Sequence, residues 1–140
     1  MSRRGFILAG LVILLAAIVF FSNRPEPEPE VSSPKEAAAG QIDEVIKEGQ
    51  SAWLFFRTST CPACVELNES FVSLQPEYEG QVVFIDINLD EESNRELGRE
   101  YRIGYVPQTY IIDANGDVTY QMVGNIPLTD LRSELDRVAQ

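Results

Sequence analysis

The stretch that decides the fold runs from Ala52 to Cys64 and reads Ala-Trp-Leu-Phe-Phe-Arg-Thr-Ser-Thr-Cys-Pro-Ala-Cys. It opens with five consecutive apolar residues, 52–56, a pattern typical of a strand that is buried on both faces. Two cysteines follow, and an amphipathic helical pattern continues from them to near Pro76. The stretch therefore predicts a buried strand that leads into a helix beginning at Cys61. The residues of this helix that we expect to face the core are Val65, Phe71 and Leu74.

The sequence on both sides of this stretch alternates between helical and extended patterns. Ser33 to Glu36 has the form of a capping box, and the helix that it starts should end at Gly49. After the cysteine helix come a second buried apolar strand, 82–87, and a charged helix, 91–101. Asn115-Gly116 separates two further apolar runs, which is a strong signal for a β-hairpin before the last helix. The side chains expected to face inward from the two later helices are Leu97, Tyr101, Leu128, Leu131, Leu135 and Val138.

The predicted order of elements is thus αβαβαββα. Two strands that are joined through a helix should be parallel, whereas the strands of the terminal hairpin are antiparallel. The order therefore predicts an α/β domain in which a mixed central sheet is covered by helices on both faces.

The N-terminal part of the chain differs in composition from the rest. Arg3 and Arg4 precede an unbroken apolar run, Gly5 to Phe21, which would span roughly 26 Å as a helix. That length is at the lower edge of what crosses a bilayer. The run ends in bulky residues rather than in the small residues of a cleavage site, so we favour one uncleaved transmembrane helix over a cleaved signal peptide. The positive-inside rule then places the N-terminus in the cytoplasm and the domain outside it, in the periplasm or at the cell exterior.

A stretch of alternating proline and glutamate follows the apolar run. Such a sequence favours an extended polyproline conformation and acts as a semi-rigid spacer. The chain is therefore divided into a transmembrane signal-anchor (1–22), a Pro/Glu-rich linker (23–37) and one globular domain (38–140).

The charge and the residue types missing from the chain exclude several classes of function. The formal net charge is −11 and no basic stripe interrupts it, which argues against nucleic-acid binding. The chain has no histidine, and its two cysteines would supply only half of a structural zinc site. We therefore expect no metal site and no cofactor.

The two cysteines, Cys61 and Cys64, are the candidate reactive groups. At positions i and i+3 of a helix their thiols face one another, so that a disulfide between them is geometrically accessible. The N-terminus of the helix carries a partial positive charge that favours the thiolate of Cys61. Cys61 is thus the expected nucleophile, and Cys64 would resolve the mixed disulfide. A purely structural disulfide is the alternative, but so short a loop constrains little of the unfolded chain.

With these features together, residues 40–140 resemble the thioredoxin family. The resemblance rests on the apolar strand before the Cys-x-x-Cys helix, on the Asn88-x-Asp90 ending of the second strand, on Val106-Pro107 and on the final hairpin. It implies a thioredoxin-like, three-layer αβα fold and a cis peptide bond before Pro107. By the same resemblance Pro107 would lie against the cysteines, and the backbone of Val106 would pair with an extended substrate segment.

The chain departs from the family pattern at the acid–base position. The buried aspartate of the family, which takes a proton from the resolving thiol, falls on Phe55, and the lysine usually near it falls on Asp86. Asp86 is thus the candidate proton acceptor for Cys64, and we expect it to be semi-buried with a raised pKa. A strand-end aspartate that faces solvent is the alternative.

The sequence predicts a membrane-tethered enzyme that exchanges disulfides with protein substrates. Because the compartment outside the cytoplasm is usually oxidising, a reductase there would be recharged by a membrane electron-transfer partner. An oxidase or isomerase of protein disulfides and a non-catalytic peptide-binding module are the alternatives.

Overall fold

The computed structural model describes residues 37–139. The elements of this part follow one another in the predicted order αβαβαββα, with two short 3₁₀ helices added. They are α2 (Ala37–Glu48), β1 (Ser51–Arg57), α3 (Pro62–Leu74), η1 (Gln75–Glu77), β2 (Val82–Asn88), η2 (Glu92–Asn94), α4 (Arg95–Glu100), β3 (Gln108–Ile112), β4 (Val118–Val123) and α5 (Leu128–Val138).

The four strands form one mixed sheet in the order β2-β1-β3-β4. β1 pairs in parallel with β2, and β3 pairs antiparallel with β4, as predicted. β1 also pairs antiparallel with β3, a pairing that the sequence did not specify. β1 is central, and its residues from Ser51 to Phe56 are all buried. β2 is an edge strand, so the expectation that it is buried on both faces is wrong: Val83 and Phe84 are half-buried and Asp86 is exposed.

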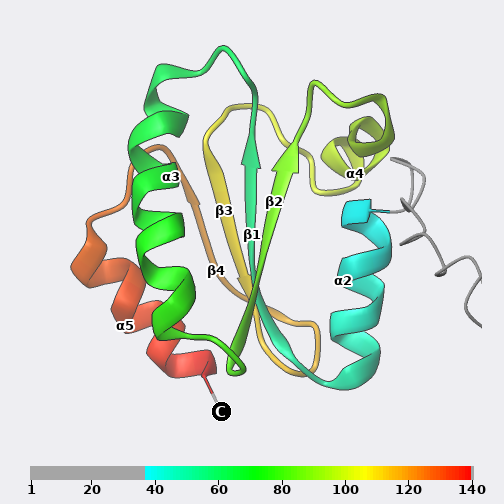
Figure 1. The fold of residues 1–140 in the computed structure, drawn as a ribbon. Coiled ribbons are helices and arrows are strands. Elements are labelled where there is room, and N and C mark those ends of the chain that lie inside the picture. Colours follow the sequence, from blue (N-terminus) through cyan, green and yellow to red (C-terminus); the bar gives the residue numbers. More distant parts are fainter. Residues whose placement is uncertain (1–36, 140) are drawn as a thin grey trace, which may run out of the picture. The chain divides into compact units, whose positions relative to one another are not determined.

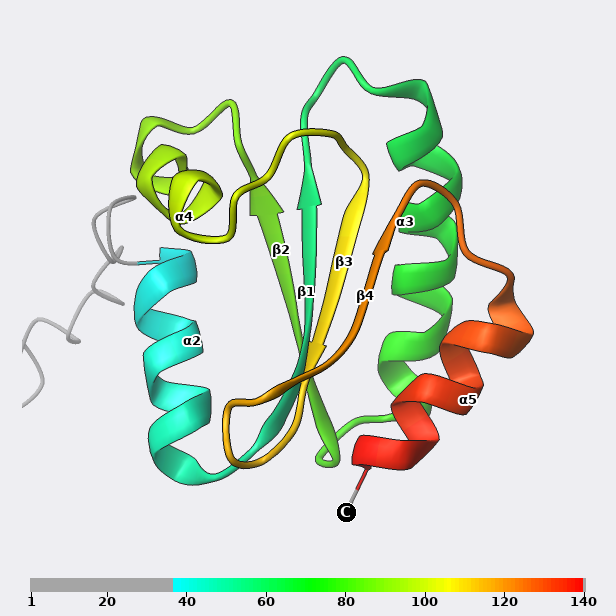
Figure 2. The same cartoon turned by 180° about the vertical axis from the view of Figure 1, so that it is seen from behind.

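Helices cover both faces of the sheet, α3 and α5 one face and α2 and α4 the other (Figures 1 and 2). Alternate residues of β1 supply the two cores, because successive side chains of a strand point to opposite faces. Trp53 and Phe55 pack in the cluster with α3 and α5, whereas Leu54 and Phe56 pack in the cluster with α2 and α4. The predicted three-layer αβα arrangement is confirmed.

Three predictions about the helices need correction. Val65 is 62% exposed, and the inward position in this part of α3 belongs to Leu67, two residues later. Leu128 is exposed at the start of α5, while Leu131, Leu135 and Val138 are buried as expected. The charged helix is shorter than predicted, because η2 replaces its first turn.

The predicted transmembrane anchor and the Pro/Glu-rich linker up to residue 36 lie outside the described residues, and residue 37, the predicted end of the linker, is the first residue of α2. Within 37–139, no helix combines the length and the apolar character that crossing a membrane requires.

Candidate active site

The two cysteines lie where β1 leads into α3, and they form a disulfide with Cα atoms 5.2 Å apart. Cys61 is the N-cap residue of α3 and Pro62 occupies its first turn. Proline is well placed there, because the first N–H groups of a helix have no partner within the helix. The N–H of Cys64 donates to Sγ of Cys61 at 3.1 Å. The prediction that the helix begins at Cys61 is confirmed.

The two sulfurs differ in their surroundings. Cys64 is 3% exposed and packs in the same apolar cluster as Phe55 and Phe71. Cys61 is half-buried and contacts this cluster from its edge. A thiol-containing partner can therefore reach Cys61 more readily than Cys64.

A pocket of about 250 Å³ is lined in part by both cysteines. Besides the two cysteines, its walls come from the end of β1, the loop that follows and the first two turns of α3. The lining residues are Arg57, Thr58, Ser59, Cys61, Cys64, Val65 and Asn68. Cys64 thus has an apolar cluster on one side and a mostly polar pocket on the other.

The peptide bond between Val106 and Pro107 is cis, as the resemblance implied. Pro107 is buried, and its carbonyl accepts a hydrogen bond from the N–H of Gly124 at 2.8 Å. The next residue, Gln108, pairs with Phe56 near the end of β1. The Val106–Pro107 bond and the cysteine loop therefore lie at the same end of the sheet, and Val106 and Cys61 contact the same apolar cluster.

Asp86 lies beside Phe55 in the sheet register, on the face that α3 covers. The expectation that its carboxylate is semi-buried is wrong, because β2 is an edge strand and 37% of this side chain is exposed. Both carboxylate oxygens accept from the guanidinium of Arg57, from Nε at 2.6 Å and from Nη2 at 2.7 Å. This bond to Asp86 is the main reason that the pKa of Arg57 is raised.

A second group of polar contacts fixes the loop before the cysteines. The backbone N–H of Ser59 donates to Oδ2 of Asp90 at 2.6 Å, and Nδ2 of Asn88 donates to Oγ of Ser59 at 3.3 Å. The bond from the Ser59 backbone is the main cause of a lowered pKa at Asp90. These contacts tie the loop after β1 to the loop after β2, and they show what the Asn88-x-Asp90 ending does structurally.

Sequence reasoning missed the part that Arg57 plays in this site. A signal was present, since an arginine that follows five apolar residues in a buried strand needs a partner or a route to solvent. The register that brings it to Asp86 depends on how β1 pairs with β2, which the sequence alone does not specify.

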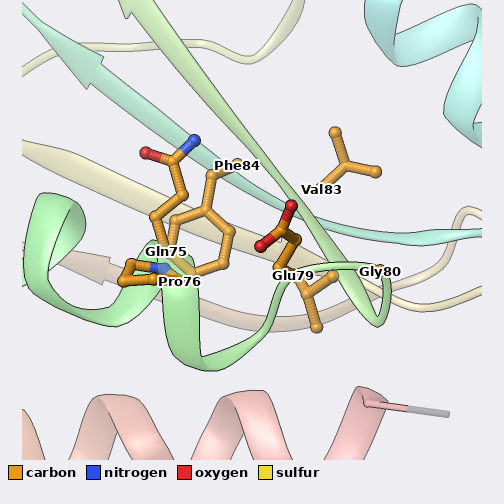
Figure 3. A pocket seen from close by; sticks show the side chains of 7 residues that line it. Gln75, Pro76, Glu79, Gly80, Val83 and Phe84 are labelled. Atoms are coloured by element: carbon orange, nitrogen blue, oxygen red, sulfur yellow. The ribbon is translucent and has the colours of Figure 1, made fainter.

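A larger pocket, of about 500 Å³, lies elsewhere in the domain (Figure 3). Its walls come from the segment that follows the C-terminal end of α3, and the lining residues are Gln75, Pro76, Glu79, Gly80, Val82, Val83 and Phe84. The cysteines are at the other end of this 13-residue helix, roughly 20 Å away. The larger pocket is therefore not part of the disulfide site, although its volume is greater.

The fold and the site define a class. A helix begins where a buried parallel strand ends, a disulfide closes its first turn, and a cis-proline lies at the same sheet end. These are the features of an αβα disulfide-exchange protein. The family model described as "Thioredoxin-like domain" matches residues 39–139, and the chain belongs to this family.

The relatives are thiol–disulfide proteins. Thioredoxin 2 of Chlorobaculum tepidum is 30% identical over 93 residues, which cover 66% of this chain and 83% of the relative. The thiol:disulfide interchange protein TxlA of Synechococcus elongatus is 20% identical over 138 residues, 99% of this chain and 72% of the relative. The chloroplastic thioredoxin-like protein HCF164 of Arabidopsis thaliana is 21% identical over 94% of this chain and 50% of its own length. With the disulfide at the start of α3, the protein is a thioredoxin-like disulfide oxidoreductase.

Proposed function

We propose that this protein is a membrane-tethered reductase of protein disulfides outside the cytoplasm, with Cys61 as nucleophile and Cys64 as resolving thiol. The observation that carries the proposal is the unequal exposure of the two sulfurs at the N-terminus of α3. The more accessible Cys61 is also the N-cap residue, where the partial positive charge of the helix favours a thiolate.

The exchange moves two electrons in two steps. The Cys61 thiolate attacks one sulfur of a substrate disulfide, a mixed disulfide forms, and the other substrate sulfur leaves as a thiolate. Cys64 then loses its proton and attacks Sγ of Cys61, which releases the second substrate thiol and leaves the Cys61–Cys64 disulfide. A dithiol donor in the membrane reverses these steps on the enzyme and restores both thiols.

The segment that precedes β3 is the proposed docking site for an extended substrate. Within residues 37–139 no hydrogen bond occupies the backbone N–H or C=O of Val106, so both are free to pair with a substrate strand. Apolar side chains flank this end of the sheet: Tyr105 is 78% exposed, Met122 44% and Val123 48%. We infer that Val106 and Pro107 contact the residues beside the substrate cysteine.

The tether and the direction of transfer rest on the sequence. The apolar run 5–21 supports an anchor, and the similarity to TxlA extends over 99% of the chain and so includes this run. An anchored domain is held close to a membrane electron carrier, and this proximity supports reduction in an oxidising compartment. Fractionation of cells should recover the protein in membranes, with the domain open to externally added protease.

Trapping of the mixed disulfide tests the roles of the two cysteines. Cys64→Ser should accumulate mixed disulfides with substrate proteins, whereas Cys61→Ser is the matched control and should accumulate few. The reduction potential of the pair tests the direction: a value near −270 mV supports a reductase and one near −120 mV an oxidase. Equal trapping by both variants would contradict the assignment of Cys61, and trapping by neither would favour a non-catalytic peptide-binding module.

The proposed mechanism also needs a group that accepts the proton of Cys64. Asp86 is the candidate that the sequence offers, but it is exposed and both of its oxygens bind Arg57. If Asp86 accepts the proton directly, Asp86→Asn should slow the resolving step around neutral pH and leave the alkylation of Cys61 nearly unchanged.

A further inference from the structure

We propose that the ion pair of Arg57 and Asp86 sets the acidity of the active-site thiols. The positive charge of Arg57 favours the thiolate, and the negative charge of Asp86 weakens this effect. The proposal deepens the function proposed above and rests on it. It assigns Asp86 a different task from proton acceptance, namely to hold and partly neutralise the guanidinium.

Arg57 lines the same pocket as the two cysteines, and it is the positively charged residue among those that line it. Its side chain is 28% exposed, so the guanidinium is only partly screened by solvent. A positive charge at the edge of a small pocket stabilises a thiolate that forms at the same pocket.

The bond to Asp86 fixes where this charge lies. Asp86 accepts from both Nε and Nη2 of Arg57, and this bidentate geometry restricts a guanidinium to one orientation. Nη1 has no hydrogen-bond acceptor among residues 37–139. Asp86 therefore positions Arg57, and its negative charge also weakens the effect of Arg57 on the sulfurs.

Most of the other charged groups around the pair are acidic; an exception is Arg95, which lies near enough to Asp90 to help lower its pKa. Asp90 and Glu91, in the loop after β2, act on the guanidinium together with Asp86 and raise its pKa. Glu66, on α3, lies two residues after Cys64 and hydrogen-bonds with Asn125. The chain has no histidine, and Arg57 is the one cationic side chain among the residues that line the pocket, so it is the group placed to offset the effect of these carboxylates on a thiolate.

The proposal can be distinguished from a purely structural role of the ion pair. If the pair sets thiol acidity, removing the charge of Arg57 and removing the charge of Asp86 should shift that acidity in opposite directions. Arg57→Gln leaves the Asp86 carboxylate uncompensated and should raise the pKa of Cys61 by about half a unit. Asp86→Asn leaves the guanidinium uncompensated and should lower it by about the same amount. In the double variant, Arg57→Gln with Asp86→Asn, the pKa of Cys61 should lie between its values in the two single variants.

The experiment is the pH profile of iodoacetamide alkylation of the fully reduced protein, with the modified cysteine assigned by mass spectrometry. Below the pKa of Cys61, the rate should fall about threefold in Arg57→Gln and rise about threefold in Asp86→Asn. Arg57→Lys keeps the positive charge but cannot form the bidentate hydrogen bond. Its alkylation rate should be closer to that of the wild type than the rate of Arg57→Gln is. It also provides a milder variant if Arg57→Gln fails to fold.

The matched control is the Arg99–Glu96 pair, an exposed ion pair on α4 that takes no part in the pocket. Arg99→Gln and Glu96→Gln should leave the alkylation profile unchanged. Shifts of equal sign in Arg57→Gln and Asp86→Asn, or no shift in either, would overturn the proposal. A slower resolving step in Asp86→Asn without a change in Cys61 acidity would overturn it in favour of proton acceptance by Asp86. Because alkylation needs no protein substrate, this result does not depend on whether the chain reduces disulfides in the cell.

Discussion

Tyr78 provides a test of the structure through the pH dependence of stability. Its ring is buried beneath α3 and α5, and its hydroxyl donates to Oδ1 of Asp136 at 2.7 Å. Burial and, second, the bond to Asp136 raise the pKa of Tyr78 to about 12. The perturbation that we consider is Tyr78→Phe, which removes the hydroxyl and leaves the ring in place.

The sign of the effect follows from the raised pKa. The folded state binds the phenolic proton more tightly than the unfolded chain, in which the pKa is about 10. The stabilisation by Tyr78 is therefore fully present below pH ~10 and is lost as the pH rises towards ~12. Two pKa units correspond to about 2.7 kcal/mol. Because Asp136 is exposed and solvent screens the bond, we expect about 1 kcal/mol.

The assay is urea unfolding of the oxidised protein at a series of alkaline pH values, followed by the fluorescence of Trp53, which is fully buried. Tyr78→Phe should be less stable than the wild type by about 1 kcal/mol at neutral pH, and this difference should shrink above pH ~10. Tyr105→Phe, at a side chain that is 78% exposed, is the matched control and should match the wild type. The reasoning is refuted if the Tyr78→Phe and wild-type curves stay parallel throughout the alkaline range.

Two further predictions concern the active-site helix. The four-residue loop between Cys61 and Cys64 is short, so its closure should stabilise the oxidised protein over the reduced one only by an amount at the low end for a disulfide, about 2 kcal/mol, measured by urea unfolding with and without reductant. A more stable reduced form would instead indicate an oxidase, because stabilisation of the thiol state makes a disulfide more oxidising. Phe71→Ala should cost about 3–5 kcal/mol, since this ring is 5% exposed and packs against Trp53 at a centroid distance of 4.9 Å. Its neighbour Val72, which is 57% exposed, is the control: Val72→Ala should change stability by less than about 0.5 kcal/mol, and a comparable loss in both variants would contradict the packing described.

The fold could be predicted from the sequence because its strongest local signals agree with the tertiary structure. The apolar run 52–56 becomes the central strand, Asn115-Gly116 becomes the turn of a hairpin, and the spacing of Leu131, Leu135 and Val138 becomes the buried face of α5. In each case a pattern within a few residues already decides the local structure, and in the strand and the helix it also decides which side chains are buried.

The errors came from features that depend on neighbours far away in the chain. The apolar run 82–87 predicts burial on both faces, but β2 pairs with one strand only, so Asp86 reaches solvent. Val65 satisfies the helical pattern, but at this point α3 faces the pocket beside the disulfide rather than the core. Edge position and pocket walls are properties of the assembled sheet and helices, and no local pattern encodes them.

The replacement of a buried aspartate by Phe55 has a consequence for how Cys64 can ionise. Phe55 is fully buried, and together with Phe71 it closes the core side of Cys64 with apolar groups that can neither accept a proton nor stabilise a thiolate. The other side of Cys64 is the pocket lined by Arg57, Thr58, Ser59 and Asn68. A proton that leaves Cys64 is therefore expected to leave through this pocket, and Arg57 is the positively charged residue of its lining. Under the proposal made above, acid–base control in this chain would lie at the edge of the sheet, where Arg57 and Asp86 form their ion pair, and would depend on that pair and on solvent.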